Sequence, residues 1–264
     1  MIKSVIWSSM IDYPDNVCTT LFTGVCNFDC EFCYNKGLLK EKELNFEKDI
    51  FPKLMERKDF IDHVIISGGE CTIHPEFEKI VNRLYENGFK IGIHTNGYAP
   101  EILERIIDKI DFIGMDIKND FDNYDEITNI QVDTDKIKKS VDLILNSKVK
   151  YEFRTTVYPK YVSMENLISI AKYLKNAGAK SYVLQNYFDH NKTVIPYSTE
   201  MLKDIIAALN GEMINAIGVL QFNEDLSPYD TAKAALWNRK NFFGYRIIMT
   251  SLISGVSENS ECGY

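Results

Sequence analysis

The chain has 264 residues, of which 45% are hydrophobic and 26% charged. This is the composition of an ordinary globular protein, long enough for one domain with a full core or two small domains. With 30 Lys and Arg against 38 Asp and Glu the net charge is −8, which argues against a nucleic-acid partner. No apolar run reaches the roughly 18 residues of a transmembrane helix, and the first residues show no signal peptide. We therefore expect a cytoplasmic protein with no membrane association.

Short apolar runs rich in Val, Ile, Phe and Tyr recur along the first part of the chain and predict buried strands. The predicted strands are 17–23, 63–67, 90–95, 111–117, 150–157 and 181–185. Amphipathic patterns between them predict helices over 45–57, 75–87, 100–109, 134–147 and 163–176. Strands that alternate with helices at this spacing form parallel βαβ units, so we expect the α/β class.

Six strands are too few for a closed eight-stranded barrel and enough for a partial (β/α)6 barrel. We expect residues 1–190 to form this barrel, with its ligand site at the C-terminal ends of the strands. The alternation weakens afterwards, where the pattern predicts a helix over 199–209 and strands over 216–222 and 245–251. We expect residues 191–264 to be a C-terminal extension that packs on the barrel, with a mobile polar tail.

Three of the six cysteines fall within eight residues, because Cys26, Cys30 and Cys33 form a C-x3-C-x2-C motif after the first predicted strand. This spacing is typical of a metal site, whereas disulfide frameworks belong to short exported chains. Structural zinc needs four protein ligands, and no fourth is evident nearby. Three thiolates on a four-iron cluster would leave one iron open to a substrate or cofactor. The alternatives are a zinc site completed by Cys71 or a histidine, and three merely buried thiols.

The motif, with Phe32 just before its third cysteine, resembles the signature of the radical S-adenosylmethionine (SAM) superfamily. The resemblance implies that family's partial barrel, with Cys26, Cys30 and Cys33 as catalytic metal ligands of one [4Fe-4S] cluster and Phe32 beside the cofactor. It also implies that the open iron chelates SAM, whose one-electron cleavage gives methionine and a 5′-deoxyadenosyl radical that abstracts hydrogen. Cluster potentials span roughly −700 to +450 mV. Because this chemistry needs the low end, the resemblance implies a low-potential donor such as flavodoxin or ferredoxin.

A Gly-Gly-Glu segment ends the second predicted strand. Its glycines, Gly68 and Gly69, let the backbone approach a ligand closely, and the carboxylate of Glu70 can receive an ammonium group. In the family this segment holds the amino group of SAM, so the resemblance makes all three cofactor-binding residues. The family usually has proline next, where this chain has Cys71. A simple turn is the structural alternative.

The third predicted strand ends in His94, Thr95, Asn96 and Gly97. This resembles the D-T-N-G segment of glycyl-radical-enzyme activases, which implies that Thr95 and Asn96 contact the cofactor. In those enzymes the Asp and Thr also help to form a monovalent-cation site. A neutral histidine is a poor ligand for a hard cation, so His94 puts that cation site in doubt.

Charged and polar residues also end the next three predicted strands. Asp116 and Lys118 match the D-x-K of the same activases, which implies that they lie near SAM. An arginine in a buried strand needs an anionic partner, so Arg154 is a candidate for the SAM carboxylate, with a structural Asp or Glu as the alternative. Gln185 ends the sixth strand and is a candidate contact for SAM or substrate.

The order of motifs resembles activating proteins of anaerobic ribonucleoside-triphosphate reductase, over about residues 1–190. The matching segments are IDYP at 11–14, the cysteine motif, SGGE at 67–70, TNGY at 95–98, MDIK at 115–118, EFRTTV at 152–157 and YVLQ at 182–185. The resemblance implies hydrogen abstraction from a glycine of a glycyl-radical enzyme, most specifically that reductase. One alternative is a radical SAM enzyme that modifies a peptide or small molecule. The other is a zinc-bound scaffolding protein.

Overall fold

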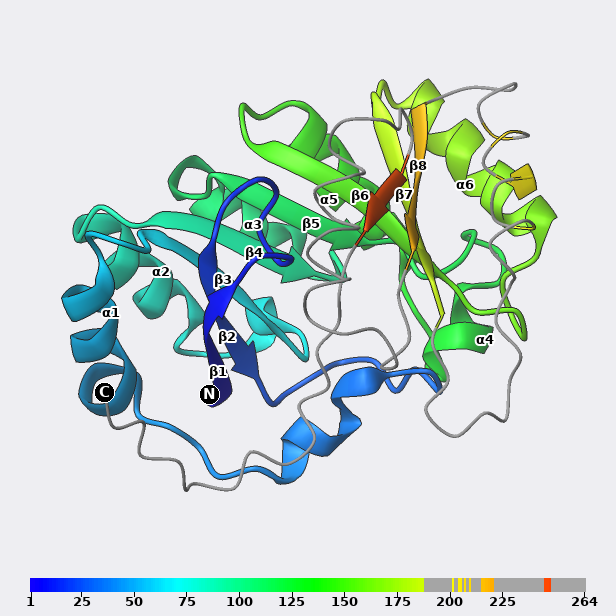
Figure 1. The fold of residues 1–264 in the computed structure, drawn as a ribbon. Helices are drawn as coiled ribbons and strands as arrows, with labels where there is room; N and C mark the ends of the chain where they lie inside the picture. Colours follow the sequence, from blue (N-terminus) through cyan, green and yellow to red (C-terminus); the bar gives the residue numbers. More distant parts are fainter. Residues whose placement is uncertain are drawn as a thin grey trace.

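The computed structural model describes residues 1–187 and, beyond them, residues 201, 204, 205, 207 and 209 and the backbone of 215–220 and 245–247. Its centre is one curved sheet in which the strands follow one another in chain order (Figure 1). The strands are β1 (Ile2–Ser9), β2 (Cys18–Thr23), β3 (His63–Gly68), β4 (Lys90–Thr95), β5 (Phe112–Asp116), β6 (Lys150–Val157), β7 (Ser181–Asn186), β8 (Asn215–Leu220) and β9 (Tyr245–Ile247).

All neighbouring strands from β2 to β9 run parallel, and only β1 runs antiparallel to its neighbour β2. The sheet does not close on itself, because β1 and β9 end the strand order without pairing to each other. Because strands in chain order need crossovers on one side, the helices cover the outer face of the sheet. The α/β partial barrel is thus confirmed.

The helices are α1 (Phe51–Arg57), α2 (Phe77–Glu86), α3 (Pro100–Ile106), α4 (Tyr124–Thr128), α5 (Thr134–Leu145) and α6 (Met164–Asn176). Their ends follow local chemistry. In α6, for example, the Ser163 hydroxyl accepts from the Asn166 N–H and the Asn166 side chain accepts from the Ser163 N–H, which forms a capping box. The apolar side of each long helix is buried against the sheet, as with Ile80, Val81 and Leu84 of α2.

The six predicted strands and five predicted helices are all present within a few residues of their expected bounds. The first helical segment begins as a π-helical turn, Phe46–Ile50, before α1 continues it. The sequence prediction missed β1 and α4. Residues 216–220 of one predicted C-terminal strand and 245–247 of the other are extended. The remainder of those strands, most of the predicted 199–209 helix and the tail lie outside the described residues. The proposed boundary at residue 190 remains a prediction.

The inside of the barrel differs from its outside. A small apolar cluster closes the end at which the strands begin, and it contains Tyr13, Cys18, Ile65 and Phe112. Polar and charged side chains occupy the interior towards the other end. The fold therefore leaves the carboxyl ends of β2 to β7 as the chemically reactive end. Among the described helices, none is long and apolar enough to cross a membrane.

Candidate active site

The cysteine loop, residues 24–35, begins where β2 ends and is held by the Gly-Gly-Glu segment at the end of β3. The Glu70 N–H donates to the Val25 carbonyl over 2.6 Å, and the Gly68 carbonyl accepts from the Asn35 side chain over 2.6 Å. A Cβ atom at Gly69 would collide with the Val25 carbonyl oxygen. The absence of side chains at Gly68 and Gly69 therefore lets the end of β3 lie close to the loop backbone, and this contact fixes both the beginning and the end of the loop.

The polar residues between the cysteines tie the loop to two further elements. The Asn27 carbonyl oxygen accepts from the Asn96 amide over 2.8 Å, which links the residue after Cys26 to the end of β4. The Asp29 N–H donates to the Thr128 carbonyl over 3.0 Å, and its carboxylate accepts from Asn129 over 3.2 Å. These hydrogen bonds, called staples below, attach the loop to β4 and to the end of α4.

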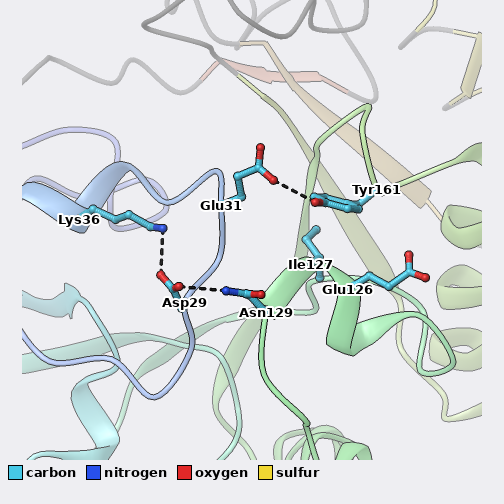
Figure 2. A pocket seen from close by; sticks show the side chains of 7 residues that line it. All are labelled: Asp29, Glu31, Lys36, Glu126, Ile127, Asn129 and Tyr161. Carbon is cyan, nitrogen blue, oxygen red and sulfur yellow. Dashed lines mark hydrogen bonds and ion pairs between the residues drawn. The ribbon is translucent and has the colours of Figure 1, made fainter.

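Glu31 makes the third staple, to the segment after β6. Its carboxylate accepts from the Tyr158 hydroxyl at 3.1 Å, from Lys160 at 2.6 Å and from the Tyr161 hydroxyl at 2.9 Å. Hydrogen bonds from Lys160 and Tyr161 lower the pKa of Glu31. Figure 2 shows this carboxylate at the rim of a cavity of about 210 Å³ that the loop forms with α4. The cavity is lined by Asp29, Glu31, Lys36, Glu126, Ile127, Asn129 and Tyr161.

The three motif cysteines are free thiols in graded environments: Cys30 is buried, Cys33 is partly buried and Cys26 is exposed. Within residues that the structure describes, no three His, Cys, Asp or Glu side chains gather around one point that could hold a single metal ion. A single zinc needs all its sulfur ligands about 2.3 Å from one centre. An iron–sulfur cluster takes each thiolate on a different iron, so its ligands are spaced more widely. Three free thiols on one short loop are a donor set that fits such a cluster.

The remaining described cysteines do not join this group. Cys71 is completely buried behind the Gly-Gly-Glu segment, and its thiol is directed to the His94 carbonyl over 3.5 Å. Burial and the nearby Glu70 carboxylate raise the pKa of Cys71. Cys18 belongs to the apolar cluster at the opposite end of the barrel. The Cys71 thiol is therefore engaged with the β4 backbone and is not grouped with the three motif cysteines.

Glu70 lies at the centre of a buried hydrogen-bond network that joins β3 to β4. One oxygen accepts from the Thr72 N–H and hydroxyl and from the Thr95 hydroxyl, and the other accepts from the Asn96 N–H over 2.6 Å. The side chain is 1% exposed, and burial raises its pKa although the donors oppose this. The structure therefore brings Glu70, Thr95 and Asn96 together as a support for the cysteine loop.

Asp116 at the end of β5 lies between two cations. Its carboxylate accepts from Arg154 of β6 over 3.1 Å and from Lys118 over 3.1 Å. Desolvation alone would raise the pKa of Asp116, but the Lys118 and Arg154 charges outweigh it and lower that pKa to about 2. Arg154 also donates to the Gly114 carbonyl over 3.2 Å. The predicted Asp116, Lys118 and Arg154 thus form one charged cluster inside the barrel.

His94 connects this charged cluster to the loop that closes the other end of the barrel. Its Nε2 lies 3.0 Å from the Asp12 carbonyl and its Nδ1 lies 3.2 Å from the Ser67 hydroxyl. Nε2 also lies 3.4 Å from Arg154 Nη1, which can only donate, whereas the nearer Asp12 carbonyl can only accept. We assign the proton to Nε2 from the shorter contact, so Arg154 acts on the imidazole as a neighbouring charge and not as a hydrogen-bond donor. Desolvation and the Arg154 charge lower the pKa of His94 to about 4, so the imidazole is neutral. The imidazole is therefore a neutral group whose two nitrogens contact Asp12 and Ser67.

Two predicted residues lie at the edges of this arrangement. Phe32 is buried against Tyr158 at 5.4 Å and Tyr187 at 6.5 Å between ring centroids. Gln185 of β7 is paired in register with Thr156 of β6, one strand beyond Arg154. Sequence reasoning missed the staples made by Asn27, Asp29 and Glu31. The available signal was that polar residues fill the positions between the cysteines, but their partners lie far along the chain.

Comparison with known proteins agrees with this geometry. The model of the radical SAM superfamily matches residues 20–174. A Methanocaldococcus jannaschii protein, named provisionally as a glycyl-radical enzyme activating enzyme, is 33% identical over 197 residues, which cover 71% of this chain and 80% of the relative. A second protein of that organism with the same name is 30% identical over 196 residues, covering 70% and 72%.

The fold is also that of solved radical SAM enzymes. A radical SAM methyltransferase from Sphaerobacter thermophilus superposes with a TM-score of 0.59 at 14% identity, over 78% of this chain and 67% of that one. At this identity the likeness shows the fold alone. Together with the family match and the cysteine loop, it establishes that the chain belongs to the radical SAM superfamily, whose cofactors are a [4Fe-4S] cluster and S-adenosylmethionine.

Proposed function

We infer that this protein is the activating enzyme of a glycyl-radical enzyme, most specifically of anaerobic ribonucleoside-triphosphate reductase. The observation that carries this proposal is the three-cysteine loop fixed over the carboxyl ends of the strands beside the Asp116 cluster. Two relatives named as glycyl-radical enzyme activating enzymes, each similar over about 70% of the chain, favour this class of substrate. The order of motifs favours the reductase as the partner.

The chain's own residues supply the ligands and the electrostatics. Cys26, Cys30 and Cys33 would hold the cluster, and the backbone of Gly68 and Gly69 would face the SAM amino group. When bound, the cluster and SAM supply reductive cleavage to a 5′-deoxyadenosyl radical. The carboxylate of Glu70 already accepts four protein hydrogen bonds, so its role is to fix the segment's backbone.

The charged cluster supplies the complementary half of a SAM site. Arg154 and Lys118 share the single carboxylate of Asp116, so one positive charge remains to attract the carboxylate of SAM. Gln185 and Phe32 border the same end of the barrel. An electron must arrive from outside the chain, and we propose a flavodoxin or ferredoxin as its source.

The first test uses anaerobically reconstituted protein. We expect about four irons per chain and release of 5′-deoxyadenosine when dithionite and SAM are added, as the radical SAM assignment requires. The Cys30→Ala variant should lose both. Zinc in place of iron, or no SAM cleavage by a fully reduced cluster, would contradict the proposal.

The second test separates the activase from the alternative. The candidate reductase is added, and a glycyl-radical EPR doublet is sought on it, with a Gly→Ala variant of the reductase's radical glycine as control. The alternative is a radical SAM enzyme that modifies a peptide or small molecule, and it is favoured by Cys71, which stands where the family usually has proline. SAM cleavage without any doublet on the reductase would favour that alternative.

A further inference from the structure

The fold turns the cation of Lys118 towards the cysteine loop. The Lys118 side chain is 15% exposed, and its ammonium lies 5.8 Å from the ring centroid of Phe32, which directly precedes Cys33. The thiols of Cys26 and Cys30 are within Coulombic reach of the same ammonium. A fixed positive charge is therefore held beside the residues that carry the cluster.

A second lysine near the loop is placed differently. Lys36 is also within Coulombic reach of Cys30, but it is 48% exposed and pairs with Asp29 over 2.9 Å. Water and salt screen such a charge, and a neighbouring carboxylate of the loop offsets it. The two lysines have the same sign and the same target, so they differ chiefly in burial.

The carboxylate that pairs with Lys118 does not neutralise its surroundings. Asp116 accepts from both Lys118 and Arg154, so two cations share one anion and an excess of one positive charge remains. The Lys118 main-chain N–H also donates to the Tyr124 hydroxyl over 3.1 Å, and Tyr124 is completely buried. Both ends of this lysine are thus anchored, which keeps the ammonium at a constant place.

We propose that the ammonium of Lys118 raises the reduction potential of the cluster held by Cys26, Cys30 and Cys33, and that Asp116 limits this effect. The inference rests on the proposed cluster site. One-electron reduction adds a negative charge next to the lysine, so a fixed cation stabilises the reduced form more than the oxidised form. Delivery of an electron from a ferredoxin or flavodoxin thereby becomes more favourable before SAM is bound.

The test is an EPR-monitored redox titration of cluster-loaded protein without SAM. In Lys118→Gln, the ratio of reduced to oxidised cluster at a fixed ambient potential should fall about tenfold, which equals a midpoint about 59 mV lower for one electron. Lys118→Arg should stay within about threefold of the wild type, because the charge is retained. Asp116→Asn removes the opposing charge and should move the midpoint in the other direction.

Lys36→Gln is the matched control. Its midpoint should move less than that of Lys118→Gln, and the difference from wild type should vanish at high salt because Lys36 is exposed. Equal midpoints for wild type and Lys118→Gln, or an equally large effect of Lys36→Gln, would overturn the inference. If Lys118→Gln does not take up a cluster, the midpoint of Asp116→Asn decides: a higher midpoint than wild type supports the inference, and an equal or lower one overturns it. A wild type without a cluster defeats the proposed function too, whereas SAM cleavage with unchanged midpoints defeats only this inference.

Discussion

Gly69 and Gly37 both follow the cysteine motif in sequence, and their surroundings are opposite. A Cβ atom at Gly69 would meet the backbone of Val25, while a Cβ atom at Gly37 meets nothing within 4 Å. A backbone carbonyl cannot rotate away as a flexible side chain can. A methyl group at Gly69 would therefore force the backbone of the loop to move. The absent side chain at Gly69 thus sets how closely the cysteine loop sits on β3.

We expect Gly69→Ala to lower the free energy of unfolding by about 1–3 kcal/mol, the usual range for overpacking a tight contact. The displaced loop should also retain less iron after reconstitution. Denaturant unfolding and iron analysis measure the two effects. Gly37→Ala is the matched control and should change stability by less than about 0.5 kcal/mol. Equal stability and iron content of the two variants would show that the approach of Gly69 to Val25 is not required.

Residue-level chemistry was predictable where it is local in sequence. The spacing of Cys26, Cys30 and Cys33 identifies the loop, and the glycines before Glu70 indicate a close approach. The role of the Glu70 side chain was not predictable, because two of its four donors, Thr95 and Asn96, lie at the end of β4, more than twenty residues later. Sequence alone suggests a carboxylate that receives a ligand, whereas the structure uses it to hold the backbone.

Most of the cysteine loop has no regular secondary structure, and its shape depends on its neighbours. It is held by β3 through backbone hydrogen bonds, by β4 through Asn27, by α4 through Asp29 and by the segment after β6 through Glu31. The loop has little apolar area of its own, so these hydrogen bonds and not a hydrophobic core hold it in place.

Removal of one staple should loosen the loop without unfolding the barrel. In Glu31→Ala, the Tyr158, Lys160 and Tyr161 partners lose their shared acceptor, and we expect the cluster to be lost to a chelator severalfold faster. Bleaching of the cluster's visible absorbance measures the rate. Stability should fall by no more than about 1 kcal/mol, because the contacts are near the surface.

Glu126→Ala provides the control for that variant. Glu126 lines the same cavity in Figure 2 but lies on α4, outside the cysteine loop. Its removal deletes a carboxylate of the same charge from the same rim, so any general effect of charge on chelator access should appear in both variants. Equal bleaching rates for Glu31→Ala and Glu126→Ala would show that the staple does not retain the cluster.

Helices and strands were predictable where burial produces a recognisable pattern of apolar residues in the sequence. The strands from β2 to β7 have neighbours on both sides, and their buried apolar runs stand out. β1 was missed because it is an edge strand whose central residues are only partly buried. α4 was missed because five residues are too few to show a helical period.

At the scale of the whole molecule, a polar chain of contacts runs through the barrel interior. It begins at Asp12, whose carboxylate accepts from Ser9 over 2.6 Å and from Thr20 over 2.7 Å. It continues through His94 to the cluster of Arg154, Asp116 and Lys118. Parallel barrels of this type are commonly filled by branched apolar side chains. The polar filling here positions charge near the cysteines and makes the fold sensitive to protonation.

His94 is the histidine in this chain of contacts, and its burial makes the stability of the fold depend on pH. Its pKa is lowered to about 4, whereas an unfolded histidine titrates near 6.5. Between these values the unfolded state binds more protons than the folded state, so stability rises with pH and is lost as pH falls from about 6.5 towards 4. Asp12, Asp116 and Arg154 face the imidazole, and the pKa of Asp116 is about 2, so this carboxylate titrates below the window.

We therefore expect the wild type to lose roughly 2 kcal/mol of stability between pH 7 and pH 5 through this one residue. His94→Gln keeps a donor for the Asp12 carbonyl but cannot take up a proton, so the difference between the two proteins isolates the histidine. Denaturant unfolding of the wild type and of His94→Gln under the same conditions at each pH gives the difference in their free energies of unfolding. The free energy of unfolding of the wild type should fall relative to that of His94→Gln as pH falls, because only the wild type has the His94 imidazole, which is protonated more readily in the unfolded state. Parallel curves across pH 5–7 would mean that the imidazole is not held neutral inside the barrel, and that the polar interior tolerates a further positive charge beside Arg154.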